Sequence, residues 1–292
     1  MNVRQLSVSR RTITIAAALA GLVSLALGAH AALYKRTPDA GTKAIAADIN
    51  GEVDNGAQRI ALVIGNGHYP DASAPLIQPI NDARALTSAL RREGFDVDVV
   101  EDASKDDMSR AVERLKSKIR PQSVVMLFFG GYGIQVRRES YMIPVDAAIW
   151  KEDDVRRDGT SIESVLAAMK ERGADAKLVV IDASRRNPYE RRFRAFSHGL
   201  APVNAPENAL ILSSATPGKV ADDSNGQYSI LMAELLNNLN AQASVEAVFS
   251  KTRLAISRAS EGEQVPSVSS SLVEDFYFGS EEMAAAADKT GG

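Results

Sequence analysis

The sequence contains no cysteine among its 292 residues. This absence excludes disulfide bonds, thiolate metal sites, iron–sulfur clusters and every mechanism with a cysteine nucleophile. Aromatic residues make up only 5% of the chain, which is too few for a face that stacks nucleic-acid bases. The net charge of −3 provides no basic field either, so we expect no nucleic-acid partner. The hydrophobic content of 45% is that of an ordinary globular protein and argues against wholesale disorder.

Formal charge is also missing from residues 12–34. A helix of this length spans the hydrocarbon core of a bilayer, which is about 30 Å thick. Three basic residues precede the stretch and two follow it, a bias that places the N-terminus in the cytoplasm. These residues are Arg4, Arg10, Arg11, Lys35 and Arg36. The sequence therefore predicts a single-pass anchor in the inner membrane, with the body of the protein in the periplasm.

A cleaved export signal is the alternative for the same segment. Ala29-His30-Ala31 has the small-x-small form of a cleavage site, and it follows an apolar run of signal-peptide length. Ser9-Arg10-Arg11 resembles a twin-arginine signal, although Thr14 departs from that pattern. Both interpretations place the body outside the cytoplasm, and they remain open at this point.

The rest of the chain divides by composition. A basic N-terminal region covers residues 1–11 and is followed by the apolar segment at 12–34. Residues 35–58 are mostly small, polar and aperiodic, which predicts a linker, and residues 279–292 predict a flexible tail. Between them, residues 59–278 form one block without an internal repeat, so we expect a single domain.

Within this block, buried apolar runs alternate with amphipathic stretches. The expected strands are Ile60–Ile64, Phe95–Val100, Val124–Phe129, Tyr141–Val145, Leu178–Ile181, Ala209–Leu212 and Phe276–Phe278. The expected helices are Asn81–Arg92, Asp106–Ile119, Ile162–Lys170, Ser229–Asn238 and Val245–Arg258. This order predicts an α/β domain with a mostly parallel sheet and helices on both faces. The functional site of such a sheet lies at the carboxyl ends of its strands, here in loops 65–75, 130–138 and 182–205.

Six short motifs occur in this block in a fixed order. They are Ile60–Asn66 (IALVIGN), Asn81–Arg84 (NDAR), Phe129–Gln135 (FGGYGIQ), Pro144–Asp146 (PVD), Asp182–Pro188 (DASRRNP) and Asp275–Phe278 (DFYF). Together they resemble the caspase-like family, most closely bacterial orthocaspases and metacaspases, over residues 59–278. The resemblance implies a three-layer sandwich with a mostly parallel six-stranded sheet.

The catalytic residues of that family are replaced here. The family's histidine base lies in a Gly-His-Gly turn, and the corresponding turn is Gly131-Tyr132-Gly133. The family's cysteine nucleophile ends an Asp-Ala-Cys segment, which here is Asp182-Ala183-Ser184. A phenol with a pKa of about 10 is a poor base at neutral pH, and a serine hydroxyl needs a base. We therefore predict an inactive member, a pseudo-protease.

An active hydrolase is the alternative hypothesis. In it Ser184 is the nucleophile, with specificity for basic residues, and His68 or His198 serves as a displaced base. Such an arrangement needs a third group that orients the imidazole, and none is visible in the sequence.

The substrate-binding residues of the family have matches in this chain. Metacaspase-like relatives bind an arginine or lysine side chain in an acidic pocket, and the matching residues are Asp82 and Asp182. A carboxylate pair holds a basic side chain by charge-assisted hydrogen bonds. Equally, Asp82 would cap its helix and Asp182 would brace a loop. A pocket without a nucleophile would make the domain a peptide-binding module.

Two charged clusters are interpreted as solvated surface. One contains five arginines between residues 185 and 194, and the other contains the acidic residues of 152–158. The acidic spacing does not match a calcium loop, so we expect no metal and no cofactor. The sequence thus predicts an exported, membrane-anchored domain that binds a peptide or protein partner, with pairing to an active caspase-like relative as one option. A purely structural envelope protein is a third interpretation.

Overall fold

The structure is a computed structural model that describes residues 58–70, 76–186, 188–189, 199–221, 226–239 and 242–279. The expected anchor at 12–34 and residues 280–292 of the expected tail lie outside these ranges. Among the helices that are described, none has both the length and the apolar character needed to cross a bilayer. The account below therefore concerns the block that follows the linker.

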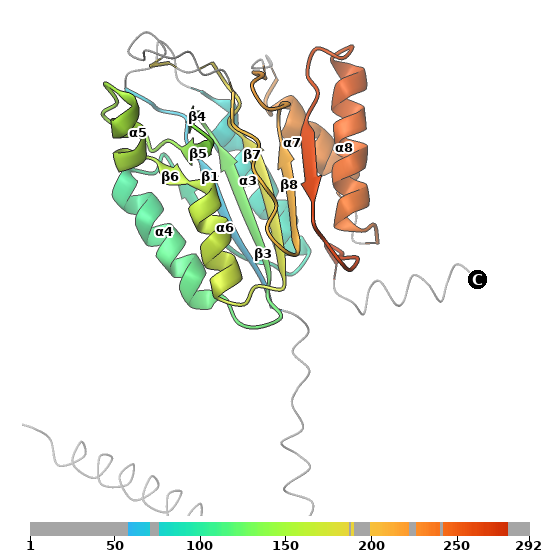
Figure 1. Cartoon of the computed structure of the whole chain (residues 1–292). Helices are drawn as coiled ribbons and strands as arrows, with labels where there is room; N and C mark the ends of the chain where they lie inside the picture. Colours follow the sequence, from blue (N-terminus) through green and yellow to red (C-terminus); the bar gives the residue numbers. More distant parts are fainter. Residues whose placement is uncertain are drawn as a thin grey trace, which may run out of the picture. The chain divides into compact units, whose positions relative to one another are not determined.

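A six-stranded sheet runs through the centre of the domain in the order β2-β1-β3-β7-β8-β9 (Figure 1). Its strands are β1 (Arg59–Gly65), β2 (Asp96–Glu101), β3 (Val124–Gly130), β7 (Ala176–Asp182), β8 (Ala209–Ser213) and β9 (Ser267–Ser270). The first five strands in this order are parallel, and β9 is antiparallel to β8. The expectation of a mostly parallel six-stranded sheet is confirmed.

Helices cover both faces of the sheet (Figure 1). They are α3 (Gln78–Arg92), α4 (Lys105–Lys118), α5 (Glu152–Asp158), α6 (Ile162–Glu171), α7 (Ile230–Asn238) and α8 (Val245–Ala259). Side chains from α4 and α6 build one hydrophobic cluster against the sheet, and side chains from α3, α7 and α8 build the other. Strands β1, β3 and β7 are buried almost throughout, as expected of parallel strands packed on both faces.

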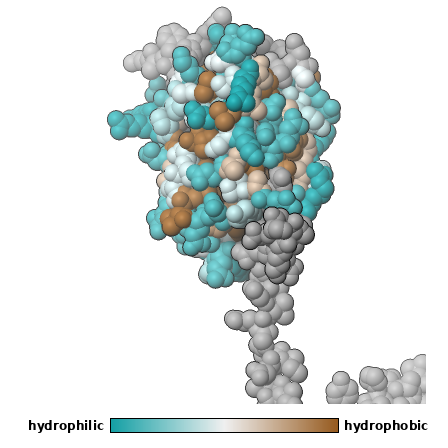
Figure 2. Space-filling model, turned by 90° about the vertical axis from the view of Figure 1, so that its right-hand side faces the viewer, coloured by the Kyte–Doolittle hydropathy of each residue, from teal (hydrophilic) through white to brown (hydrophobic). Residues whose placement is uncertain are grey.

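The surface carries few large apolar side chains. Those exposed within the described residues are Ile77, Trp150, Leu254 and Val273. On the face shown in Figure 2, hydrophobic residues occur in patches among hydrophilic ones. Exposed apolar residues in this number are normal for the surface of a globular domain.

Serine side chains define the beginning of four helices. Ser104, Ser161, Ser229 and Ser244 each accept a hydrogen bond from a backbone N–H in the first turn. Helix α3 has no such cap and begins three residues before the expected start at Asn81. Pro79 lies in its first turn, where the missing N–H of a proline costs nothing.

The last strand of the sheet differs from the expectation. Phe276–Phe278 was expected to be a strand, but Tyr277 makes only an isolated bridge with Ser244. Phe278 is a fully buried core residue with its ring 6.5 Å from that of Phe249. The sixth strand is β9, whose sequence SVSS has a single apolar residue. Its pairing with β8, rather than its hydrophobicity, makes it a strand.

A second, three-stranded sheet was only partly anticipated. It consists of β4 (Gly133–Val136), β5 (Glu139–Met142) and β6 (Thr160–Ser161), paired in that order and antiparallel. The strand expected at Tyr141–Val145 is β5, which begins earlier and ends at Met142. Tyr132 therefore lies between the end of β3 and the beginning of this hairpin.

Asn66, directly after β1, ties three loops together. Its side-chain oxygen accepts from the Ala103 N–H at 2.8 Å, and its amide donates to the Ile143 carbonyl at 3.1 Å. Because the side chain is fully buried, Asn66→Ala leaves the Ala103 N–H without this partner and removes one of the two hydrogen bonds to the Ile143 carbonyl, which also accepts from the Tyr69 hydroxyl. We expect the free energy of unfolding to fall by about 2–4 kcal/mol, measured by urea unfolding of the full-length protein in mild detergent.

The matched control is Asn81→Ala. Asn81 is partly exposed and donates one side-chain hydrogen bond, to the Gln227 carbonyl. We expect this variant to lose less than about 1 kcal/mol. Equal losses in the two variants would contradict the role assigned to Asn66.

Candidate functional site

Tyr132 and Ser184, which the motifs predict to occupy the family's catalytic positions, lie on neighbouring strand extensions. Beyond the ends of β3 and β7, the Gly131 N–H donates to the Asp182 carbonyl at 3.2 Å. The Gly133 N–H donates to the Ala183 carbonyl at 3.0 Å. The structure thus carries Tyr132 and Ser184 on adjacent segments at the carboxyl edge of the sheet, as the sequence predicts.

The glycines on either side of Tyr132 are required by close packing. A Cβ atom at Gly133 would lie 2.9 Å from the Ala183 carbonyl oxygen and 2.7 Å from Leu200 Cδ2. A Cβ atom at Gly131 would lie 2.6 Å from the Tyr69 hydroxyl. The turn therefore has no room for a side chain at either glycine.

Tyr132 packs against other aromatic side chains. Its ring lies edge-on to Tyr69 with 4.8 Å between the centroids, and its N–H donates to the Tyr69 hydroxyl at 3.1 Å. Tyr69 is buried and donates in turn to the Ile143 carbonyl, and burial raises the pKa of its phenol. Tyr132 joins Tyr69 and the buried Tyr189 in one apolar cluster. The position of the family's base is thus held by a packed aromatic ring.

Ser184 is almost completely shielded from solvent, with 1% of its surface exposed. Its carbonyl accepts a hydrogen bond of 2.7 Å from the Ala221 N–H, which holds the segment after β7 against a later loop. A nucleophile must reach the carbonyl that it attacks. In the conformation described here, a substrate cannot reach the Ser184 hydroxyl.

Asp82 and Asp182 come together beneath this surface. Asp82 is fully buried inside α3 and accepts from the Ser229 N–H at 3.1 Å, so it does not cap its own helix. Asp182 ends β7 and is 3% exposed. Burial and the charge of Asp182 raise the pKa of Asp82 to about 7, against the lowering effects of Ser229 and Arg185. The two buried carboxyls therefore lie close enough for their charges to interact, and we call their shared surroundings the recess.

Arg185 lies in the same recess, which the sequence did not anticipate. It was assigned to a solvated loop, but it is only 5% exposed. Its Nη1 donates to the Gly131 carbonyl at 3.0 Å and to the Asp182 carbonyl, and its Nη2 lies 3.6 Å from Asp182 Oδ2. The negative charge at the end of β7 and the need to pair a buried guanidinium explain its position.

His68 has an orienting partner that the sequence analysis missed. Its Nδ1 lies 2.5 Å from Asp102 Oδ2, and Asp102 Oδ1 accepts from the N–H groups of Gly67 and His68. Burial opposes ionisation of Asp102, yet these hydrogen bonds bring its pKa below the usual value. The signal was present, because β1 and β2 are adjacent parallel strands and the two residues follow their ends.

The remaining residues that the sequence singled out are a histidine, the loop arginines and the acidic cluster at 152–158. His198 lies outside the described residues, as do Arg191, Arg192 and Arg194. The acidic residues at 152–158 form α5, where the buried Asp154 accepts from the backbone N–H groups of Trp150 and Lys151. Among the residues that the structure describes, no group of three or more potential metal ligands was found.

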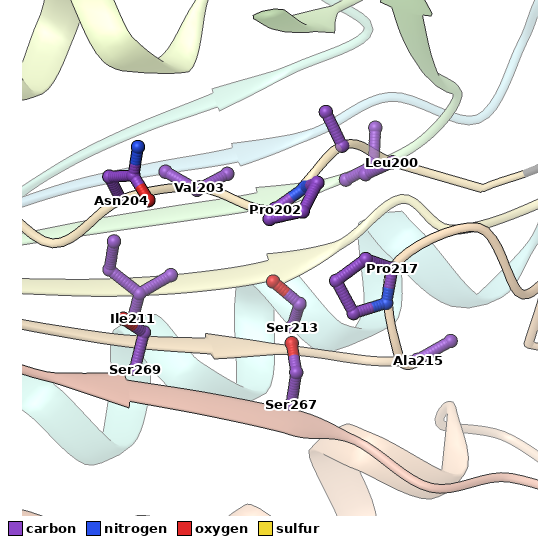
Figure 3. A pocket seen from close by; sticks show the side chains of 11 residues that line it. Leu200, Pro202, Val203, Asn204, Ile211, Ser213, Ala215, Pro217, Ser267 and Ser269 are labelled. Carbon is purple, nitrogen blue, oxygen red and sulfur yellow. The ribbon is translucent and has the colours of Figure 1, made fainter. Parts of the chain in front are cut away.

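A groove lies away from these residues, over the last two strands of the sheet (Figure 3). It has a volume of about 160 Å³. The chain segment from Leu200 to Asn204 forms one wall, and Ile211 and Ser213 of β8 with Ser267 and Ser269 of β9 form the other (Figure 3). None of Tyr132, Ser184, Asp82 and Asp182 lines it.

The mostly parallel six-stranded sheet with helices on both faces is that of a caspase-like α/β domain. A family model described as "Caspase domain" matches residues 58–277. The chain therefore belongs to the caspase-domain family, as its motifs indicated.

Two curated relatives support this assignment. The chain is 28% identical over 137 residues to human "Mucosa-associated lymphoid tissue lymphoma translocation protein 1", and equally to its mouse homolog. The matched part covers 45% of this chain and only 16% of each relative. The similarity concerns one domain of much longer proteins.

Proposed function

We propose that the protein is a pseudo-protease: a caspase domain that binds a basic segment of a peptide or protein partner without cleaving it. The single observation that carries this proposal is that tyrosine and serine, at 132 and 184, stand where the family's motifs have histidine and cysteine, on backbone segments joined by hydrogen bonds. Residues 12–34 would tether the domain to the membrane with its body outside the cytoplasm, and an active caspase-like relative is one candidate partner.

The geometry around both replaced residues supports the absence of turnover. Tyr132 is engaged in an aromatic cluster, and a neutral phenol is a weak base at pH 7. Ser184 is shielded from solvent. The acidic pair supports the choice of a basic partner, because two carboxyls in a desolvated recess favour a cationic side chain.

The proposal predicts charge-selective binding without cleavage. Full-length protein in mild detergent is expected to bind a fluorescent peptide with a central arginine more tightly than the same peptide with glutamine, measured by anisotropy. Asp82→Asn is expected to remove this preference, whereas Asp96→Asn, at an exposed position of β2, is expected to keep it. Mass spectrometry is expected to recover the bound peptide intact. Equal binding of both peptides by the unmodified protein would contradict the proposal.

A working serine hydrolase is a second candidate, because of the contact between His68 and Asp102. The carboxylate orients the imidazole through Nδ1 and leaves Nε2 available as a base. His68 is 68% exposed in its side chain, while Ser184 is buried. This candidate therefore requires the segment at Ser184 to move. It predicts peptide hydrolysis that is lost on Ser184→Ala and on His68→Ala alike.

A further inference from the structure

The buried guanidinium of Arg185 is a feature that the proposed binding role does not explain. A charged side chain is seldom buried unless it is paired. Here the carbonyls of Gly131 and Asp182 accept from Nη1, and the Asp182 carboxylate lies near Nη2. These are the contacts that a bound guanidinium ligand would make, and they are provided by one of the protein's own side chains.

Within the part of the chain that the structure describes, the recess contains two carboxyl groups and one cation, Arg185. Asp82 and Asp182 face one guanidinium, and the charge of Arg185 acts on both carboxyl groups. Among the described residues, Asp182 Oδ2 is buried without a hydrogen-bond partner. The recess thus has hydrogen-bond acceptors suited to a guanidinium group. One of them, Asp182 Oδ2, lies 3.6 Å from Arg185 Nη2, which is too far for a hydrogen bond.

We propose that Arg185 is an internal ligand of the recess formed by Asp82 and Asp182, and that a guanidinium or amidine group from outside binds there only by displacing it. The inference rests on the acidic pair of the proposed function, and it adds a way in which ligand binding to that pair is regulated. Because Arg185 directly follows Ser184, its departure also moves the backbone that keeps Ser184 buried. Occupation of the recess and exposure of Ser184 are therefore coupled.

An internal ligand weakens every external one. A group tethered within the same chain acts at an effective concentration of millimolar or more. An external cation must displace this internal ligand. The apparent affinity of the external cation is therefore lower than its intrinsic affinity for the empty recess. Removing the Arg185 side chain is therefore expected to tighten the binding of small cations at least tenfold.

The test uses full-length protein in mild detergent, with ethylguanidinium and benzamidine as probes. In Arg185→Ala, ethylguanidinium is expected to raise the melting temperature and benzamidine to bind at least tenfold more tightly than in the unmodified protein, measured by calorimetry. Adding Asp82→Asn to that variant is expected to abolish both effects. The control is Arg84→Ala, which removes an exposed arginine paired with Glu101 and should bind as the unmodified protein does.

Other outcomes separate this inference from the proposed function. If the unmodified protein and Arg185→Ala bind benzamidine equally and through Asp82, the recess is already open: the inference is wrong and the proposed function stands. If neither variant binds either probe, the recess is not a cation site and both fail. If Arg185→Ala binds the probes but the unmodified protein binds no arginine peptide, the inference stands without the proposed function. Where Arg185→Ala does not fold, Arg185→Gln is titrated with benzamidine and the same criteria apply.

Discussion

Full-length protein carrying both Tyr132→His and Ser184→Cys is expected to hydrolyse arginine-terminated fluorogenic peptides at least 100-fold faster than the unmodified protein. A general base alone contributes about 10²–10⁴-fold, and a thiolate is a far better nucleophile than a neutral hydroxyl. The turn at 131–133 is hydrogen-bonded to residues 182–183, so the backbone holds the two positions next to each other. Because residue 184 is buried in the described conformation, turnover also requires the segment at 184 to open, as it would when a substrate displaces Arg185. The measurement is the initial rate over a panel of arginine- and lysine-terminated substrates.

The controls for this experiment distinguish the two candidate functions. In the unmodified protein, Ser184→Ala is expected to change nothing, because both proteins show only background hydrolysis. Turnover in the unmodified protein that disappears on Ser184→Ala would refute the pseudo-protease and favour the serine hydrolase with His68 and Asp102. A folded double variant that binds the peptides but leaves them uncut would show that the turn cannot support catalysis.

The same variant connects the catalytic positions with the internal ligand. If Arg185 competes with the substrate, adding Arg185→Gln to the double variant is expected to lower KM while leaving kcat nearly unchanged. A residue that only competes with substrate affects binding and not the chemical step. A fall in kcat would instead indicate that Arg185 positions the loop that carries residue 184.

The sequence was sufficient to predict the central sheet because that sheet is made of continuous apolar runs. Strands β1, β3 and β7 are parallel and covered on both faces, so nearly every residue in them is apolar. Strand β9 lies at the edge and takes its structure from pairing with β8, which a local pattern does not reveal. The start of α3 was misplaced because the apolar spacing that locates the helix begins at Ala83, whereas its first turn, which contains Pro79, lies before that pattern.

The sequence predicted which residues belong to the candidate site, but it did not predict which side chains they contact. The motifs located Tyr132 and Ser184 because the residues around them match the family. They did not reveal that Tyr132 packs against Tyr69 or that Arg185 is buried. Both facts depend on which distant groups the fold brings close, since Arg185 contacts Gly131 from 54 positions away in the sequence. Asp102 was missed for the same reason.

The unfolding free energy of the full-length protein is expected to depend on pH through Asp82, and Asp82→Asn is expected to remove that dependence. The pKa of Asp82 rises from its usual value near 3.8 to about 7 on folding, through burial and the charge of Asp182. Between these values the folded state retains a proton that the unfolded state has lost. The unfolding free energy therefore falls as the pH rises from about 4 to about 7, and it then levels off.

An asparagine side chain preserves the shape of the carboxyl and still accepts a hydrogen bond from Ser229, but it carries no charge. Asp82→Asn is thus expected to match the unmodified protein at pH 4 and to be more stable at pH 8, by about 2–4 kcal/mol, because each pKa unit corresponds to about 1.4 kcal/mol. Urea unfolding followed by circular dichroism at both pH values measures the difference. Asp96→Asn, which loses only an exposed ion pair with Lys118, is expected to change stability by less than about 1 kcal/mol at either pH. Destabilisation of Asp82→Asn at pH 8 would mean that folding does not raise the pKa of Asp82 and that Arg185 stabilises its carboxylate. The recess would then be a balanced ion-pair network rather than one with an excess of acid.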